Sequence, residues 1–274
     1  MQIPFYKMSG SGNDFILIDN RRDILSDIQP NLLAQKICRR KVSIGADGLI
    51  LIEPSGKAAF KWRFFNSDGS EADICGNGGR CVARLAYLLG IAPEKMKFET
   101  LAGIISAEVK DRKVKIELVS PSHIRMDITL PLEGEKLLLH TINTGVPHVV
   151  KFEEALDTVD LGSIGRKIRF HPLFQPAGTN VNLVKILNDN EIEIRTYERG
   201  VEDETLACGT GAVASALITS IKTHIQSPVK VKTKGGETLM VYFDKRGEGF
   251  EAVALEGEVR IIYQGELWEE AYQL

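Results

Sequence analysis

The stretch Asp73-Ile-Cys-Gly-Asn-Gly-Gly-Arg-Cys81 places Cys75 on a glycine-rich turn, and a helix-like run over residues 82–89 follows at once. A cysteine at such a turn faces backbone N–H groups and the positive end of a helix dipole, which together favour the thiolate over the thiol. The stretch Leu206-Ala-Cys-Gly-Thr-Gly-Ala-Val-Ala-Ser215 has the same form around Cys208. The sequence therefore predicts two reactive cysteines, each at the start of an apolar helix.

The repetition extends beyond the two cysteines. Thr100 and Thr233, each in a Thr-x-x-Gly motif between strand-like runs, follow their cysteines at the same spacing of 25 residues. Upstream, Asn66 and Arg199 each stand nine residues before a cysteine, after a strand-like run. One order of elements at one spacing predicts the internal duplication of a whole domain.

Each predicted half contains several strands but one strongly apolar helix. Alternation over residues 96–119 and 229–262 is typical of successive antiparallel strands. A helix that is apolar on most faces is usually buried on most faces. We therefore predict an α+β fold of two pseudo-symmetric domains, each a curved, mostly antiparallel sheet wrapped around a central helix, over residues 1–119 with Cys75 and 120–262 with Cys208.

The composition is that of an ordinary globular protein. The 274 residues are 43% hydrophobic and 26% charged, and the net charge of −3 gives no general attraction to nucleic acid or to an anionic membrane. No signal-peptide pattern opens the sequence, and no apolar run approaches the ~18 residues of a membrane span. We expect a cytoplasmic protein with a small-molecule substrate.

The four cysteines are too few for a disulfide scaffold in a chain of this length. Cys38 and Cys81 fall inside helical patterns and are typical of small buried hydrophobic residues. A thiol redox protein or a zinc-binding protein is a remote alternative, because the sequence contains neither Cys-x-x-Cys nor a Cys/His cluster at metal spacing. We predict no metal site.

Two duplicated cysteines suggest proton transfer rather than nucleophilic attack. A nucleophilic cysteine enzyme needs one thiolate and a base, usually histidine, whereas here the cysteine itself is duplicated. If the halves face each other across a pseudo-twofold axis, the two sulfurs lie on opposite sides of one ligand. A thiolate on one face can then remove a proton from carbon while a thiol on the other face supplies one, so Cys75 and Cys208 form the acid/base pair of a racemase or epimerase.

The surroundings suggest an α-amino acid as substrate. N–H donors at the two helix starts suit a carboxylate, which gains negative charge as the α-proton leaves. Glu198 can accept from an ammonium group, and Arg199 can bind a second carboxylate with two parallel N–H bonds. The residues at the two helix starts are Gly76, Asn77, Gly209 and Thr210, and the neutral partners are Asn13, Asn66 and Asn180.

Four candidate residues also have a purely structural interpretation. Asn13, between glycine and aspartate, can equally form an Asx turn. Glu198 and Arg199 can be a solvated pair at a strand end. The lone histidine of the predicted turn over residues 142–150, His148, is more often a hydrogen-bonded structural histidine than a catalytic one.

Over essentially its whole length the sequence resembles the diaminopimelate epimerase family. Enzymes of this family interconvert LL- and meso-2,6-diaminoheptanedioate without pyridoxal phosphate or metal, on the way to lysine and peptidoglycan. Several long motifs in the right order make the likeness specific. They are Lys7-Met-Ser-Gly-Ser-Gly-Asn-Asp-Phe15, Phe65-Asn-Ser-Asp-Gly-Ser-Glu71, Cys75-Gly-Asn-Gly-Gly-Arg-Cys81, Gly178-Thr-Asn-Val-Asn182, Tyr197-Glu-Arg-Gly200 and Ala207-Cys-Gly-Thr-Gly211.

The resemblance implies a role for each candidate residue. Cys75 and Cys208 correspond to the acid/base pair, and His148 and Glu198 to positions that tune the pKa of the thiols. The implied substrate-binding residues are Asn13, Asn66, Gly76, Asn77, Asn180, Glu198, Arg199, Gly209 and Thr210.

The resemblance also implies a homodimer, to which the C-terminal strand near Tyr263 contributes after it returns to the first domain as residues 263–274. Two positions depart from the family pattern: many members have Asn at Val146, and some have Gln at Gly48. The nearest alternative is another cofactor-independent racemase of the same fold, such as a proline racemase. Its pocket holds a monocarboxylate, which Arg199 and the surrounding asparagines fit less well.

Overall fold

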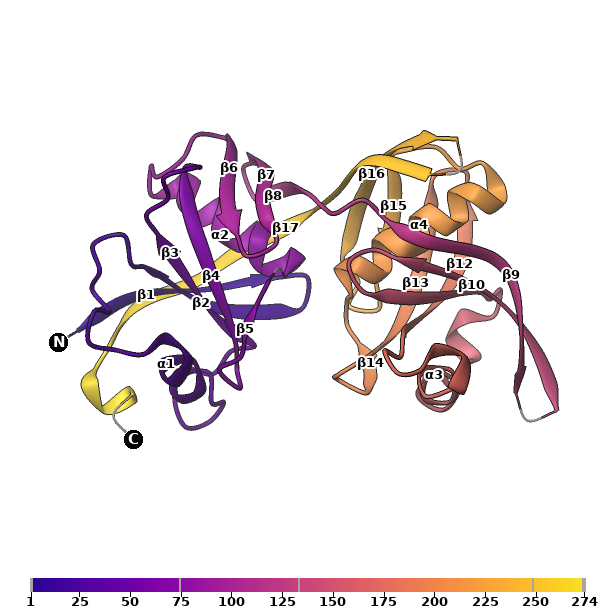
Figure 1. Cartoon of the computed structure of the whole chain (residues 1–274), viewed down its shortest axis with the longest axis horizontal. Helices are drawn as coiled ribbons and strands as arrows, with labels where there is room; N and C mark the ends of the chain where they lie inside the picture. The colour runs from indigo at the N-terminus through magenta and orange to yellow at the C-terminus, as the bar shows by residue number, and fades with distance from the viewer. Residues whose placement is uncertain (1, 74, 133, 248, 273–274) are drawn as a thin grey trace. The chain divides into compact units, whose positions relative to one another are not determined.

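A computed structural model describes residues 2–73, 75–132, 134–247 and 249–272 (Figure 1). Its internal contacts divide the chain into two compact units, Met1–Ile116 with Gly257–Leu274, and Glu117–Glu256. The domain boundaries expected from the sequence, after residues 119 and 262, lie later in the chain than these. The second boundary between the units lies inside one continuous strand, β17 (Gly249–Leu267), so no break in the sequence pattern marks it. Residues 1, 273 and 274 of the expected ranges lie outside the described residues.

The first unit is a mixed sheet. Its elements are β1 (Ile3–Gly10), β2 (Asn13–Asp19), α1 (Pro30–Ile37), β3 (Gly48–Glu53), β4 (Phe60–Asn66), β5 (Glu71–Ala72), α2 (Gly76–Leu88), β6 (Lys95–Thr100), β7 (Gly103–Lys110), β8 (Lys113–Glu117), the end of β17 (Gly249–Leu267) and a 3₁₀ turn, η3 (Glu269–Ala271). β1 pairs antiparallel with β2 and β17, β3 with β4, β4 with β5, and β7 with β6 and β8, whereas β2–β3 and β4–β6 are parallel.

The second unit repeats this order of pairings. Its elements are β9 (Ser122–Leu132), β10 (Glu135–Asn143), β11 (Pro147–Phe152), η1 (Leu156–Thr158), α3 (Leu161–Arg169), η2 (Pro172–Phe174), β12 (Asn180–Asn188), β13 (Glu191–Glu198), β14 (Asp203–Thr205), α4 (Gly209–Thr223), β15 (Val229–Lys232), β16 (Thr238–Arg246) and the start of β17. The strands β10 to β17 take the places of β1 to β8, and β11–β12 and β13–β15 are the parallel pairs.

The parallel pairs arise from the helices. Parallel neighbours cannot be joined by a tight hairpin, and here the connections from β2 to β3, β4 to β6, β11 to β12 and β13 to β15 contain α1, α2, α3 and α4 in turn. The sequence predicted α1 and the two cysteine-bearing helices but did not identify α3. The chain thus has an α+β fold dominated by mixed sheets.

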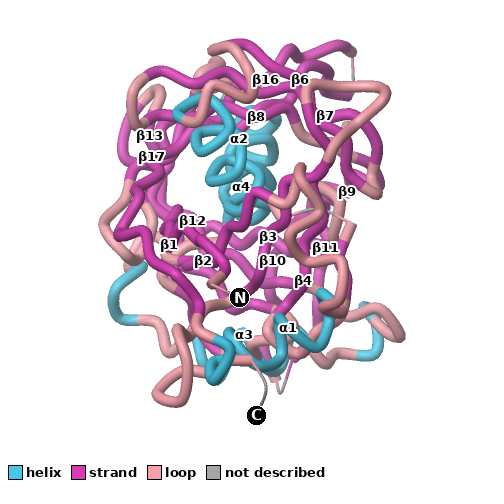
Figure 2. Tube along the Cα trace, turned by 90° about the vertical axis from the view of Figure 1, so that its left-hand side faces the viewer, coloured by secondary structure: helices cyan, strands magenta, loops and turns pink. Residues whose placement is uncertain are grey.

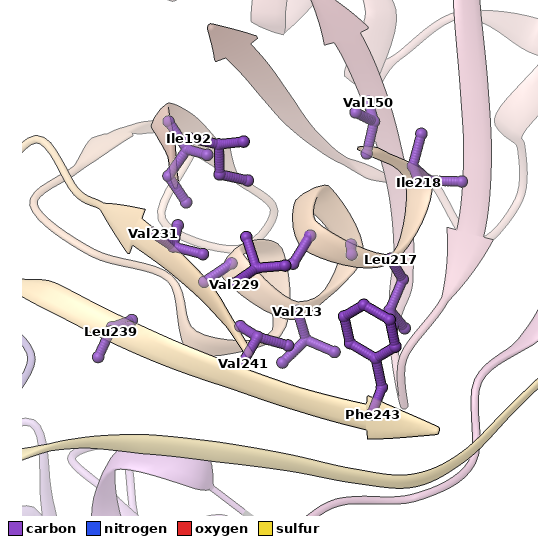
Figure 3. Close-up of a cluster of buried hydrophobic side chains, with 14 of the residues drawn as sticks. Val150, Ile192, Val213, Leu217, Ile218, Val229, Val231, Leu239, Val241 and Phe243 are labelled. Atoms are coloured by element: carbon purple, nitrogen blue, oxygen red, sulfur yellow. The ribbon is translucent and has the colours of Figure 1, made fainter. Parts of the chain in front are cut away.

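α2 and α4 are enclosed by the strands of their own units (Figure 2). Residues from Gly211 to Ser220 of α4 are buried on every side. Side chains of β15 and β16, such as Val229 and Val241, turn towards Val213 and Leu217 of this helix (Figure 3). Each such fully buried aliphatic side chain contributes about 1.5–3 kcal/mol, so packing around the helix fixes where its N-terminus lies.

α1 and α3 cover the opposite face of the strands. Leu49 and Leu51 pack with α1, and Val181 and Leu183 pack with α3. These strands are buried on both faces, which explains their continuous apolar runs. The side chains between these positions face the central helix. Among the described residues, no helix is both long enough and apolar enough to cross a membrane.

Candidate active-site residues at two helix N-termini

Cys75 is the N-cap residue of α2. Its backbone is extended, with φ −139° and ψ 116°, and its sulfur accepts a hydrogen bond from the Gly78 N–H at 3.5 Å. The side chain is half-buried, and the space where a side chain of Gly76 would stand is open. An N–H donor and the helix dipole both stabilise a thiolate at this position.

Cys208 occupies the same position on α4. It is the N-cap residue, with φ −125° and ψ 111°, and it is 5% exposed. Its sulfur lies 3.5 Å from the Thr210 hydroxyl oxygen. A methyl group on Gly211 would stand 3.3 Å from the sulfur, so the first turn of α4 closes tightly around this cysteine.

The other two cysteines do not stand at a helix N-terminus: Cys38 is the C-cap residue of α1, and Cys81 lies inside α2. Burial raises the pKa of the Cys38 thiol to about 12. Cys38 therefore remains a thiol at physiological pH. Within the described part of the chain, no three His, Cys, Asp or Glu side chains are grouped so that they could hold a metal ion.

Two of the three candidate polar residues of the first unit lie together. Asn77, the second residue of α2, donates to Asn13 Oδ1 at 2.7 Å, and Asn13 donates to Asp47 Oδ2 at 2.9 Å. Asn66 ends β4 and donates to the Ser70 hydroxyl at 2.9 Å. Asp47 thus holds Asn13 in place.

The candidate residues of the second unit gather where β12 begins and β13 ends. Asn180 Oδ1 accepts from the Arg199 backbone N–H at 2.8 Å, and the Arg199 guanidinium donates to the Ala177 carbonyl at 2.7 Å. Glu198 Oε2 accepts from the Thr205 hydroxyl at 3.0 Å. Gly209 and Thr210 form the first turn of α4, held by a 3.1 Å bond from the Thr144 hydroxyl to the Thr210 carbonyl.

Asn66 and Glu198 are the last residues of the corresponding strands β4 and β13. The spacing of nine residues before a cysteine pointed to Arg199 as the counterpart of Asn66. Strand pairing shows otherwise: Phe64 pairs with Ala72, whereas Thr196 pairs with Thr205, so the hairpin after β13 is one residue longer. Glu198 and not Arg199 therefore takes the place of Asn66.

His148 is fully buried beside Asn180 in the β11–β12 pair. Burial, helped by the positive charge of Arg199, lowers the pKa of His148 to about 3. Its Nδ1 lies 3.1 Å from Asn182 Nδ2. Asn182 Oδ1 accepts from the Thr196 hydroxyl at 2.9 Å. We call His148, Asn182 and Thr196 the polar cluster.

The sequence predicted no role for Asn182 or Thr196. The one available signal was a polar residue inside the apolar run Val181–Val184, because a polar side chain there is buried and needs partners.

The structure explains one departure from the family pattern. A Cβ atom on Gly48 would stand 2.5 Å from the Phe64 ring and 2.6 Å from the Phe65 carbonyl oxygen, so no side chain fits there. The other position that departs from the family pattern is Val146, whose backbone carbonyl accepts from the Thr144 N–H at 3.2 Å. The valine side chain cannot make the polar contact that an asparagine side chain would make there.

Comparison with known proteins gives consistent matches along the chain. The family model described as diaminopimelate epimerase matches residues 5–124 and 140–262. A diaminopimelate epimerase from Aquifex aeolicus is 46% identical, over 99% of this chain and 100% of the relative.

Two solved structures are similar in fold. One is a phenazine biosynthesis protein of the PhzF family from Bacillus anthracis, with a TM-score of 0.74, 15% identity, and coverage of 98% of this chain and 99% of that chain. The other is a probable proline racemase from Agrobacterium radiobacter, with a TM-score of 0.69, 15% identity, and coverage of 99% and 94%. At this identity the likeness is one of fold alone.

Proposed function

The chain belongs to the diaminopimelate epimerase family, and we propose that it is an isomerase that interconverts LL- and meso-2,6-diaminoheptanedioate for lysine and peptidoglycan synthesis. The observation that carries this proposal is that a family member holds two cysteines, Cys75 and Cys208, as the N-cap residues of α2 and α4.

In the proposed reaction, one cysteine acts as base and the other as acid. A thiolate takes the α-proton, the electron pair of the C–H bond moves into the carboxylate to form an enediolate, and the second thiol gives its proton to the opposite face of the carbon. The α-carbon is inverted, and the two sulfurs exchange protonation states. N–H groups at the two helix starts stabilise the enediolate more than the ground-state carboxylate. The route needs only side chains and backbone of this chain.

Substrate selection rests on the polar side chains near the strand ends. Arg199 binds the distal carboxylate and Glu198 accepts from an ammonium group, while Asn13, Asn66 and Asn180 contribute neutral bonds. The hydrogen bond from the Arg199 backbone N–H to Asn180 Oδ1 supports this role, because it fixes the backbone of Arg199 beside the start of β12. A monocarboxylate substrate, as in a proline racemase, would leave Arg199 without its ligand.

The finer architecture is part of the same proposal. The recurring order of strand pairings supports two pseudo-symmetric domains that descend from one duplicated domain, with His148 and Glu198 tuning the thiols. We place the enzyme in the cytoplasm as a homodimer. The exposed side chains of Ile262 (54%) and Tyr263 (45%) on β17 support a subunit contact there, and Tyr263→Glu should shift sedimentation equilibrium towards the monomer.

The decisive experiment is epimerisation in deuterated water without added cofactor. Purified protein with LL-diaminopimelate should give meso product that carries one α-deuterium, while the remaining substrate stays unlabelled early in the reaction, because separate groups remove and supply the proton. L-Proline, tested in parallel, should remain unchanged. Absence of meso product would refute the proposal, and racemised proline with inert diaminopimelate would establish the alternative.

A further inference from the structure

The polar cluster lies directly beneath the first turn of α4. His148, Asn182 and Thr196 come from the adjacent strands β11, β12 and β13, on the face that α4 covers, and are 1%, 0% and 3% exposed. A methyl group on Gly211 would lie closer than 3.0 Å to Asn182 Oδ1 and 3.3 Å from Cys208 Sγ. The amide of Asn182 therefore touches the same helical turn as a proposed catalytic sulfur.

The hydrogen bonds of Asn182 leave its amide one orientation. Asn182 lies 2.9 Å from the Val149 carbonyl oxygen, which can only accept, so the nitrogen of the amide must point there. On the other side, the Thr196 hydroxyl donates to Oδ1 at 2.9 Å. The second hydrogen of Nδ2 is then directed at His148 Nδ1, at 3.1 Å.

This arrangement determines which nitrogen of the imidazole carries the proton. Nδ1 accepts from Asn182, so a neutral ring holds its hydrogen on Nε2. Burial keeps the pKa of His148 near 3, and the ring stays neutral at physiological pH. Nε2 is buried and meets no hydrogen-bond partner among the described residues. A buried N–H without a hydrogen-bond partner costs about 1–3 kcal/mol, so this donor lowers the stability of the folded protein.

We propose that Asn182 is a positioning residue that holds His148 with its hydrogen on Nε2, so that His148 serves the reaction as a hydrogen-bond donor to an anion and not as a base. This inference rests on the proposed function. The anion is one that forms during epimerisation, a thiolate or the enediolate, and an N–H aimed at it lowers the energy of the charged state without adding a full charge. In the first unit the corresponding strand positions hold Phe15, Ile50 and Phe64, so the scaffold itself does not need a polar cluster.

The first test needs no activity. In protein labelled with ¹⁵N-histidine, the chemical shifts of the two ring nitrogens show which one is protonated, and the His148→Gln spectrum identifies His148 among the five histidines. We expect Nε2 of His148 protonated and Nδ1 unprotonated between pH 5 and 8. A proton on Nδ1 would overturn the inference, whatever the enzyme does.

The second test changes one atom of Asn182. In Asn182→Asp the carboxylate can only accept, so it should draw a proton to His148 Nδ1 and lower kcat by about 10- to 100-fold, the value of one hydrogen bond to a charged group, with little change in KM. The matched control is Thr219→Val, which removes an equally buried hydroxyl bonded to the Ser215 carbonyl at 2.7 Å in the same unit. It should leave both the tautomer and kcat unaltered.

The outcomes separate this inference from the proposed function. If Asn182→Asp moves the proton while kcat stays at the parent value, the tautomer has no part in the reaction and the inference is wrong. If the parent protein does not epimerise diaminopimelate, the proposed function fails, yet the spectrum still decides the tautomer. Should Asn182→Asp not fold, Asn182→Leu, which has the same branching at Cγ but no donor, replaces it and should show the same loss in kcat.

Discussion

The N-terminal ends of α2 and α4 share one backbone plan and differ in what supports it. Each helix starts at a cysteine, and each has a glycine three residues later, pressed against a neighbouring strand. At Gly78 the neighbour is the Cδ1 methyl of Ile50, which would lie 3.0 Å from an added Cβ. At Gly211 it is the carboxamide of Asn182. The same close approach of helix and sheet is therefore built once with hydrocarbon and once with hydrogen bonds.

Strand register extends the comparison to the neighbouring residues. Ile50 stands opposite Phe64 as Asn182 stands opposite Thr196, and Phe15 stands beside Gly48 as His148 stands beside Asn180. The Phe15 and Phe64 rings pack edge to face, 5.9 Å apart. Because apolar side chains fill the corresponding three positions beside α2, the polar cluster is not a requirement of the fold. The two similar cysteine turns therefore have different chemical surroundings, as unequal roles in one reaction would require.

Removal of either sulfur has the largest expected effect, and it tests whether the cysteines at both helix N-termini take part in proton transfer. Cys75→Ala and Cys208→Ala should each lower kcat for epimerisation by at least about 10²- to 10⁴-fold, the usual worth of a positioned acid or base, because one group alone cannot invert a carbon. Cys38→Ala, which alters a buried thiol held neutral by its raised pKa, is the control and should keep the parent rate. Normal turnover by either N-cap variant, folded by circular dichroism, would sink the two-base proposal.

Replacement of His148 by the residue of the first unit tests the polar cluster itself. His148→Phe copies Phe15 and should reduce kcat by about 100-fold, since the N–H is lost. His148→Gln places an amide N–H near the former Nε2 and should stay within about 10-fold of the parent. Steady-state kinetics of the two variants decide the matter. An equal loss in both would show that His148 works as a base, because glutamine can donate but cannot take a proton.

The sequence contained enough to predict the two cysteine turns and their central helices. A glycine-rich turn before an apolar helix is a local pattern, and its repetition made it conspicuous. The partners of Asn182 could not be predicted in this way, because Thr196 lies 14 residues away and meets it only through strand register. Register also decided between Glu198 and Arg199 as the counterpart of Asn66, where residue spacing alone misled.

The parallel strand pairs could not be predicted from the sequence, for a related reason. Alternating hydrophobicity identifies strands but not their neighbours, and β2, β3, β11 and β12 are buried on both faces, so their sequences alternate little. The helix α3 packs on the outer face through a few side chains, among them Leu161 and Ile168. Its short amphipathic pattern is less conspicuous than the apolar run of α4.

Acid should destabilise the second unit through His148 in a way that the first unit, with Phe15, cannot show. The pKa of His148 falls from 6.5 to about 3 on folding. The unfolded chain therefore binds the proton that the folded chain excludes, so this contribution to stability is complete above pH 6.5 and is lost as the pH falls towards 3. At pH 5 the loss should be about 2 kcal/mol.

Urea unfolding at pH 7.5 and pH 5 measures this effect by comparison of the parent with His148→Phe. The carboxylates that also titrate are common to both proteins and cancel in the difference. The parent should lose about 2 kcal/mol more than the variant between the two pH values. Equal losses would mean that folded His148 takes up a proton as easily as unfolded histidine, which contradicts a ring held neutral beside Asn182.

The smallest expected effect comes from one methyl group added at each helix start. In a helix, alanine is favoured over glycine by about 1 kcal/mol. In Gly78→Ala the new methyl meets the ends of the Ile50 and Trp62 side chains at 3.0 and 3.3 Å. The Ile50 methyl can turn away, so the melting temperature of this variant should change little.

In Gly211→Ala the methyl meets Asn182, which three hydrogen bonds hold in place. Moving that amide breaks at least one of them, at a net cost of about 1–2 kcal/mol and a melting temperature lower by a few degrees. Calorimetry of the two variants compares the supports directly. If Gly78→Ala is the more damaging, the hydrocarbon support is the rigid one and the polar cluster adapts, which an Asn182 that fixes the histidine tautomer would not do.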